Sequence, residues 1–187
     1  MINAEKLSKR YQNATPARDK FKNLYNQVYQ YVLPDRYTQV EDKSDGQKNR
    51  LDLYTSVPEQ AGDHFVQRVQ SLLTPVNTDW VGFEAGYAFK ENNKDLTAIN
   101  QNLEKVAHIC NVFKDVSNFD SEATSFYYDL IAGTSYMFVG EGTPDNPLVF
   151  KVIPFKEMVI EEGADGYPDH FYREFKMKNE LVKEQWK

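Results

Sequence analysis

The stretch FDSEATSFYYDLIAGTSYMFVG, residues 119–140, contains the point at which the chain changes from a helical to a strand pattern. Asn118 before it is a typical helix N-cap, and acidic residues follow in the first turn. Gly133 can adopt the left-handed conformation that ends a helix. From Ser135 onward the apolar residues alternate, as they do in strands. We therefore expect an α+β fold that is mainly helical over residues 1–133, with a small antiparallel sheet over residues 134–178.

Two hairpins make up the expected sheet. Residues 135–139 and 148–153 flank the turn-rich segment GTPDNP, and residues 158–161 and 167–176 flank EGADG. Asn179 then begins another helix, but the sequence ends before that helix could bury an apolar face. We expect residues 179–187 to be the start of a truncated helix.

Upstream of residue 119, apolar residues at spacings of three and four predict several amphipathic helices that pack with this sheet. Thr15 can cap a second helix in which Pro16 is the first residue. Leu33-Pro34 should end that helix, because proline disfavours the helical conformation of the residue before it. The polar segment EDKSDGQKN, residues 41–49, is an expected exposed loop, and helical structure is expected again from about Lys48.

Two further helices precede residue 119. Ser56 and Glu59 form a capping-box pattern, and Thr74-Pro75 should end the helix that begins there. Trp80 then opens WVGF, an expected short strand, and we expect the tryptophan to be mostly buried at this helix-to-strand junction. The expected inner face of the first helix is Ala61, Phe65, Val69, Leu72 and Leu73, and that of the second is Leu96, Ile99, Leu103, Val106, Cys110 and Phe113.

Composition narrows the class of protein. A chain of 187 residues with 41% hydrophobic residues can build one substantial core. The net charge of −6 argues against a surface built chiefly to neutralise phosphates. Cys110 is the single cysteine, so no intrachain disulfide can form, which suits a reducing compartment. The sequence has no signal-peptide core and no apolar run long enough to span a bilayer.

The candidate catalytic and metal-ligating residues do not form a recognisable site. His64, His108 and His170 lie far apart with no ligand spacing to one another or to Cys110, so we interpret them as structural or surface residues. Nucleotide-binding loops and hydrolase motifs are also missing from the sequence. We therefore predict no catalytic, cofactor-binding or metal residues and no cofactor.

The acidic clusters in the sequence also lack the pattern of a metal or catalytic site. EDKSDG and EEGADG place Lys43 and Gly163 where a calcium loop needs oxygen ligands. Glu161 and Glu162 are adjacent, so in a strand they point to opposite faces and cannot act as a paired acid and base unless the turn reorients them. We interpret this pair as a solvated hairpin end.

Basic residues form two small groups that could contact phosphates, but acidic or polar neighbours accompany each group. The groups are Lys6, Lys9 and Arg10, and Lys48, Arg50 and Arg68. A solvated helix face is the interpretation that we favour for both, so nucleic-acid-binding residues stay unassigned.

Four segments, in this order and spacing, resemble the head-to-tail connector, or portal, proteins of short-tailed phages. They are LPD at 33–35, RLDLYTSVPEQAGDHFVQRVQSLLTPVNTDW at 50–80, SNFDSEATSFYYDLIAGTSYMFVGEG at 117–142, and FKVIPFKEMVIEEGADGYPDHFYREF at 150–175. The resemblance covers nearly the whole chain from about Leu7. It implies that Trp80 is a packing anchor where a long helix turns into the sheet region.

The resemblance also implies a function. Portal proteins form a ring, expected here to be a dodecamer for the full-length chain, at one capsid vertex, where double-stranded DNA is packaged and ejected. The implied partners are other copies of the chain, the capsid protein, terminase and tail or adaptor proteins, with no membrane. The implied locations are the virion and, during assembly, the host cytoplasm. Portals are not enzymes, and residues 1–187 would form a single wing-like region that alone is a monomer or small oligomer.

Two other classes of protein stay open. An independent interaction module could bind a partner on the exposed side of its sheet, and a stop codon after Lys187 in the native gene would favour it. A hydrolase could use carboxylates brought together by the fold, which a deep pocket with converging carboxylates of perturbed pKa would favour.

Overall fold

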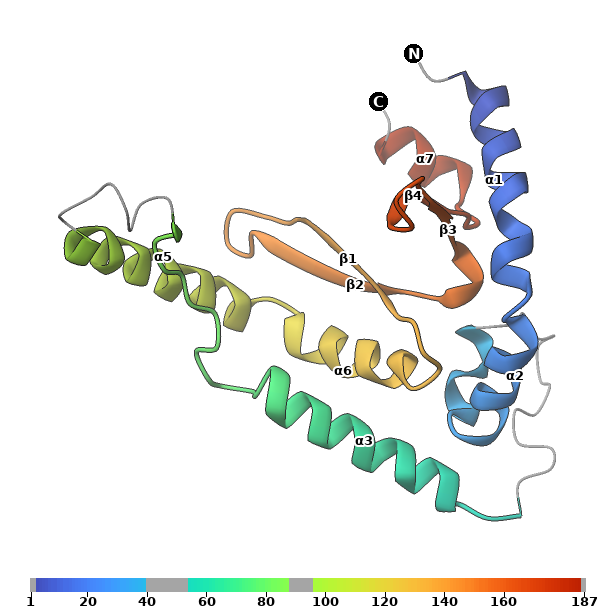
Figure 1. Cartoon of the computed structure of the whole chain (residues 1–187), viewed down its shortest axis with the longest axis horizontal. Helices are drawn as coiled ribbons and strands as arrows, with labels where there is room; N and C mark the ends of the chain where they lie inside the picture. The colour runs from blue at the N-terminus through green and yellow to red at the C-terminus, as the bar shows by residue number, and fades with distance from the viewer. Residues whose placement is uncertain (1–2, 40–53, 88–95, 186–187) are drawn as a thin grey trace. The chain divides into compact units, whose positions relative to one another are not determined.

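The computed structural model describes residues 3–39, 54–87 and 96–185 and confirms the α+β fold (Figure 1). The chain divides into two compact units. Unit 1 combines both ends of the chain, Met1–Ser56 and Ile153–Lys187, whereas unit 2 is the continuous segment Val57–Val152. The single wing-like region expected over residues 1–187 stays a prediction. The loop EDKSDGQKN and the helical structure expected near Lys48 lie outside the described residues.

Unit 1 is built from helices and one antiparallel hairpin. Its elements are α1 (Ala4–Asp19), α2 (Lys22–Tyr31), η1 (Pro34–Gln39), η2 (Phe155–Glu157), β3 (Met158–Glu162), β4 (Pro168–Arg173) and α7 (Asn179–Gln185). In the β3–β4 pair, Val159 lies opposite Tyr172 and Glu161 lies opposite His170. The hairpin expected around EGADG is therefore confirmed.

The core of unit 1 lies between α1 and the β3–β4 hairpin. Ala14 of α1 packs against buried Val159 and Tyr172, and Tyr11 meets the Tyr172 ring edge-on at 6.1 Å between ring centroids. Close by in sequence, Tyr25 of α2 stacks on Phe155 with ring centroids 3.7 Å apart. These contacts join residues from the two ends of the chain that are 130 or more positions apart.

The predicted helix start at Thr15 and Pro16 is wrong. Asn3 caps α1, its side chain accepting from the Glu5 amide at 3.1 Å, and the helix continues through Pro16. The Thr15 hydroxyl donates to the Tyr11 carbonyl at 2.9 Å, a bond made inside the helix, so it caps nothing. The predicted stop at Leu33-Pro34 is confirmed, because α2 ends at Tyr31 and η1 begins at Pro34.

In unit 2, the described residues form helices and a second two-stranded sheet. Its elements are α3 (Val57–Leu73), α5 (Leu96–Val116), α6 (Phe119–Leu130), β1 (Tyr136–Glu141) and β2 (Leu148–Ile153). Val66 of α3 packs with Ala123 and Tyr127 of α6, and the Thr74 hydroxyl lies 2.9 Å from that of Tyr127. The ends predicted at Thr74-Pro75 and near Gly133, whose φ is +116°, are confirmed.

Asn118 stands at the N-cap position of α6, as predicted, but its side chain does not cap the helix. Instead its amide pairs with the backbone of Phe150 in β2, donating to the carbonyl at 2.7 Å and accepting from the amide at 2.9 Å. Glu122 likewise accepts from the Val152 amide at 2.6 Å. Side chains of α6 thus satisfy backbone groups of β2, which attaches the hairpin to the helix.

The predicted inner face of α3 is largely wrong, whereas that of α5 is wrong at two of its six residues. The other four are half-buried: Leu96, Ile99, Leu103 and Cys110. Phe65, Leu72 and Leu73 are exposed, and the α3 residues that are buried are Gly62 and Val66. On α5, Val106 and Phe113 are exposed, whereas Ala107, Asn111 and Lys114 are buried. A periodic pattern locates an apolar stripe on a helix, but it does not state what that stripe faces.

Candidate functional site

The inward side of α5 is polar and holds an extended segment, residues 78–85. Asn111 donates to the Val81 carbonyl at 3.1 Å and accepts from the Val81 amide at 3.4 Å. Asn100 accepts from the Ala85 amide at 3.1 Å, and the Lys114 ammonium donates to the Thr78 carbonyl at 3.1 Å. Asn100, Asn111 and Lys114 share one face of the helix, because they are 11 and 3 residues apart. Side chains therefore do for this segment what a neighbouring strand does in a sheet.

Trp80 lies in this segment and is not where the sequence predicted it. Trp80 is 39% exposed, so the expectation that it is mostly buried is wrong. The segment WVGF is extended but is not a strand, so the expected strand is wrong as well. The indole contacts Phe119 at 5.6 Å between ring centroids, and the Lys114 ammonium lies 5.3 Å from the ring centroid. A segment held by side chains has no sheet to cover the indole, so one part of the ring stays in solvent. Trp80 is a partial anchor, helped by a cation–π contact.

On the side of α5 that lies opposite Asn100, Asn111 and Lys114, apolar residues face outward. Val106, Ile109, Val112, Phe113 and Val116 are each 40–58% exposed. We call these five residues and the neighbouring Lys105 the α5 outer face. A second apolar surface of this helix is therefore left in solvent.

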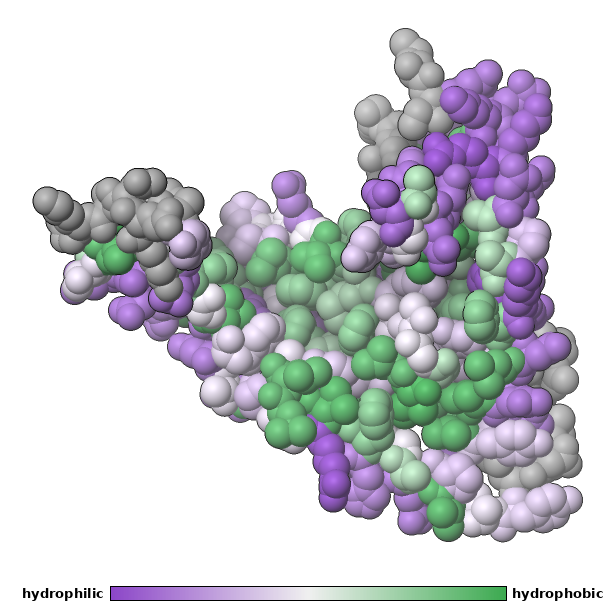
Figure 2. Space-filling view, in the orientation of Figure 1, coloured by the Kyte–Doolittle hydropathy of each residue, from purple (hydrophilic) through white to green (hydrophobic). Residues whose placement is uncertain are grey.

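A second apolar surface lies on α3 in the same unit. Phe65, Leu72 and Leu73 are exposed, Leu72 to 81%. Figure 2 shows hydrophobic residues gathered over the end of α3 that lies near α6. Exposed apolar surface of this extent on a folded protein typically marks an interaction site.

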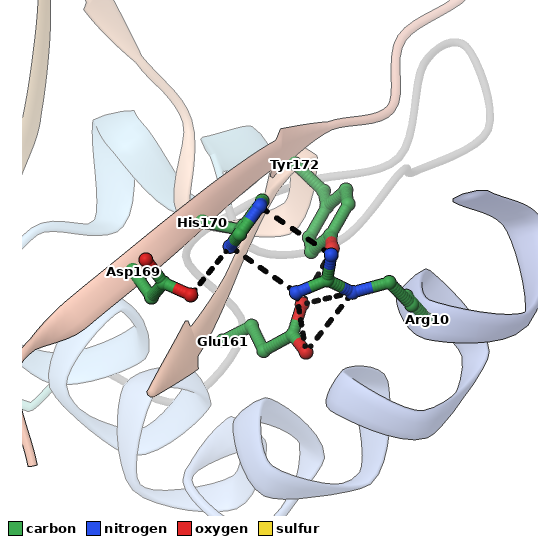
Figure 3. A network of polar contacts seen from close by, with 5 residues as sticks. All are labelled: Arg10, Glu161, Asp169, His170 and Tyr172. Carbon is green, nitrogen blue, oxygen red and sulfur yellow. Dashed lines mark hydrogen bonds and ion pairs between the residues drawn. The ribbon is translucent and has the colours of Figure 1, made fainter. Parts of the chain in front are cut away.

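Unit 1 contains a network of charged residues that links α1 to the hairpin (Figure 3). The Arg10 Nε donates to both Glu161 carboxylate oxygens at 3.2 and 3.1 Å, and a terminal nitrogen donates to Oε1 at 3.0 Å. The other face of the guanidinium lies 3.2–3.4 Å from both ring nitrogens of His170. Tyr172 donates its hydroxyl to Glu161, and His170 Nδ1 lies 2.9 Å from Asp169.

Electrostatics in this network favour the charged carboxylate. The Tyr172 hydroxyl and then the Arg10 guanidinium lower the pKa of Glu161 below its ordinary value. The same carboxylate raises the pKa of Tyr172 and that of Arg10. Each charged group here is bonded to another member of the network, which suits it to hold α1 on the hairpin.

The network corrects two expectations from the sequence. Arg10 is not on a solvated face, because it forms an ion pair with Glu161, 151 residues away. Glu161 is more than a solvated hairpin end, while Glu162 on the opposite face is exposed, as the strand pattern predicted. Sequence reasoning missed the pair because nothing local signals a contact over such a separation. The alternation of β4, which puts His170 and Tyr172 on one face, was the available signal.

The other predicted residues are scattered. His64 is exposed on α3, His108 lies 3.9 Å from Asp79, and Cys110 is half-buried on α5. Across the described ranges, no three potential ligands lie close enough to hold a metal ion. Arg68 is exposed, and Lys48 and Arg50 lie outside the described residues.

The hydrolase alternative requires a pocket with converging carboxylates. A hollow of about 480 Å³ on α5 is lined by Gln101, Glu104, Lys105, His108 and Ile109. Glu104 is the one carboxylate among these lining residues, so the lining contains no pair of acids. This hollow therefore gives the hydrolase alternative no support.

Comparisons with known proteins complete the description. In the part of the chain that is described, no helix is long and apolar enough to cross a membrane. A family model described as bacteriophage head to tail connecting protein matches residues 4–187. No curated protein matches the chain.

Proposed function

We propose that this chain, which belongs to the bacteriophage head-to-tail connecting protein family, forms a ring at one vertex of the phage capsid. Membership makes it a structural connector of the virion. The finer role that we propose is passage of double-stranded DNA through the ring during packaging and ejection, and attachment of the tail.

The observation that carries this proposal is the α5 outer face together with the exposed stripe on α3. A folded unit that turns two apolar helix faces to solvent is suited to assembly, because burying them in a contact removes apolar surface from water. A head-to-tail contact joins different surfaces of neighbouring copies, so each of these apolar faces would meet a different surface of a neighbour. Such contacts generate closed rings when the rotation closes.

The remaining parts of the proposal follow from the connector role. The ring, proposed as a dodecamer, would contact the capsid protein, terminase during packaging and tail or adaptor proteins afterwards. In this proposal, catalysis during packaging belongs to the partners and not to this chain. The protein would assemble in the host cytoplasm and end in the virion.

Electron microscopy of the purified full-length protein tests ring formation directly. We expect closed rings with a central channel, and a monomer at tens of micromolar would contradict the proposal. Phage that lack the protein test the role in DNA passage. We expect heads without packaged DNA, whereas DNA-filled heads that lack only tails would limit the role to tail attachment.

A further inference from the structure

The α5 outer face combines apolar residues with an unpaired cation. Lys105 lies one turn before Ile109, so the two are neighbours on the helix surface. The Lys105 ammonium has no ion pair with any residue that the structure describes. Asn100, Asn111 and Lys114 hold the opposite side of the helix to residues 78–85, so this orientation is fixed.

The outer face of the β3–β4 hairpin has the complementary character. Strand alternation turns Val159, Glu161, His170 and Tyr172 toward α1, which leaves Ile160, Glu162 and Phe171 on the other side. Phe171 is 60% exposed and lies opposite Ile160 in the register. The Glu162 and Asp165 carboxylates are exposed and form no ion pair with the described part of the chain.

The tip of this hairpin presents an aromatic ring from a well-defined turn. The Gly163 amide donates to the Tyr167 carbonyl at 2.8 Å, and the Gly166 amide donates to the Gly163 carbonyl at 3.1 Å. Gly166 has φ +74°, a conformation that suits glycine. The Tyr167 side chain is 76% exposed beside the two carboxylates. The ordered turn fixes the backbone that carries this ring, which lowers the entropic cost of binding.

We propose that the hairpin outer face of one copy, Ile160, Glu162, Asp165, Tyr167 and Phe171, binds the α5 outer face of a second copy. Aromatic residues would cover the apolar residues of α5, and Glu162 and Asp165 would pair with Lys105. The stripe on α3 is a poorer partner for α5, because it carries exposed Arg68 and would bring two cations together.

The extent of the two faces fits such a contact. Five half-exposed side chains on α5 offer on the order of 400 Å² of apolar surface, comparable to the largest patch on a typical monomer. The hairpin face adds two exposed aromatic residues, Tyr167 and Phe171, beside two carboxylates, so the contact would be at the low end of the size range of specific interfaces. The two faces differ and belong to different units, so the contact is head-to-tail. The inference rests on the proposed ring and names the surfaces that join its neighbours.

The first test weakens each face in the full-length protein and measures assembly by sedimentation. Ile109→Asp and Tyr167→Asp both alter exposed side chains, so each variant should fold, which circular dichroism checks. We expect each to raise the protein concentration needed for half-assembly by roughly tenfold or more, as for central interface residues. Leu7→Asp, at an exposed apolar position on α1, is the matched control and should assemble normally.

A charge exchange then identifies the partners. Lys105→Glu in one protein, and Glu162→Lys with Asp165→Lys in another, should each weaken assembly because like charges would meet. Mixing the two proteins should restore assembly, since in an alternating ring every contact again joins opposite charges.

The outcomes separate this inference from the proposed function. Normal rings from Ile109→Asp and Tyr167→Asp would overturn the inference and leave the ring intact. Assembly restored only when all three charge changes are in one chain, and not by mixing, would place the contact within a single chain and also overturn it. A wild-type protein that forms no ring would contradict the proposed function itself.

Discussion

Two asparagines act in this protein as substitutes for β-strand partners. Asn111 both donates to and accepts from the backbone of Val81, and Asn118 does the same for Phe150. A primary amide carries one acceptor and two donors, so it can match the N–H and C=O of one residue. Extended segments are thus attached to helices without the ladder of a sheet. At Val81 and at Phe150, a single amide side chain provides both hydrogen bonds.

Replacing Asn111 should therefore cost more stability than replacing the larger Trp80. Asn111 is 2% exposed, and Asn111→Ala would leave two backbone groups of Val81 without partners, at about 2–3 kcal/mol. Trp80→Ala should cost roughly 1–2 kcal/mol, below the range for fully buried aromatic residues, because the residue is 39% exposed. Urea denaturation of both variants measures the difference. A larger loss for Trp80→Ala would mean that the indole, and not the amide, holds the segment.

The Arg10–Glu161 network should make stability depend on acid pH. The pKa of Glu161 is lowered in the folded protein, so its contribution is present above the ordinary glutamate pKa of about 4.3. It is lost as the pH falls from there through the lowered folded pKa. Glu161→Gln should therefore have a lower denaturation midpoint than the wild type at pH 7, with the gap closing below about pH 4. Glu162→Gln is the control. A difference in denaturation midpoint between Glu161→Gln and the wild type that stays constant down to pH 3 would contradict the linkage.

At the scale of elements, the sequence predicted where helices stop better than which way they face. Leu33-Pro34, Thr74-Pro75 and Gly133 mark real ends because proline and glycine act on the local backbone. The faces of α3 and α5 depend on packing with distant residues, and α5 turns its buried side toward a backbone segment that requires polar side chains. The ion pair of Arg10 was unpredictable for the same reason. Its partner is set by the pairing of α1 with β3, which no local pattern states.

Helix α3 allows a direct test of this reversal. Val66, at 2% exposed, packs with Ala123 and Tyr127, so Val66→Ala should cost about 2 kcal/mol through lost burial and a small cavity. Leu72, at 81% exposed, belongs to the stripe that the sequence placed inward, and Leu72→Ala should change stability by about 0.5 kcal/mol or less. Thermal denaturation of a dilute sample measures both, so that assembly does not contribute. Equal losses of stability in the two variants would mean that Leu72 belongs to the inner face of α3, as the sequence predicted.

At the scale of the whole molecule, the two units differ in how the chain builds them. Unit 2 is one continuous segment, so a fragment of residues 57–152 keeps all of the contacts inside the unit. Unit 1 needs both ends of the chain, because α1 packs against β3 and β4 through Ala14, Val159 and Tyr172. Unit 2 is therefore inserted into unit 1 between Ser56 and Ile153.

This arrangement predicts different behaviour for fragments of the chain. Residues 57–152 should fold alone with a single cooperative transition, because the α3–α6 core and the side chains that hold residues 78–85 are all retained. Residues 1–56 alone should have little helix, since a helix the length of α1 is marginal in water without an apolar partner. Adding a peptide of residues 153–187 should raise helicity above the sum of the two spectra, because Arg10 regains Glu161 and Ala14 regains Val159.

Circular dichroism of each fragment and of the mixture measures this, with an Arg10→Ala version of residues 1–56 as the control that should gain less. Full helicity in residues 1–56 alone would show that α1 does not depend on the hairpin, and additive spectra on mixing would show that the contacts between the two ends are too weak to form unit 1 without the connecting chain.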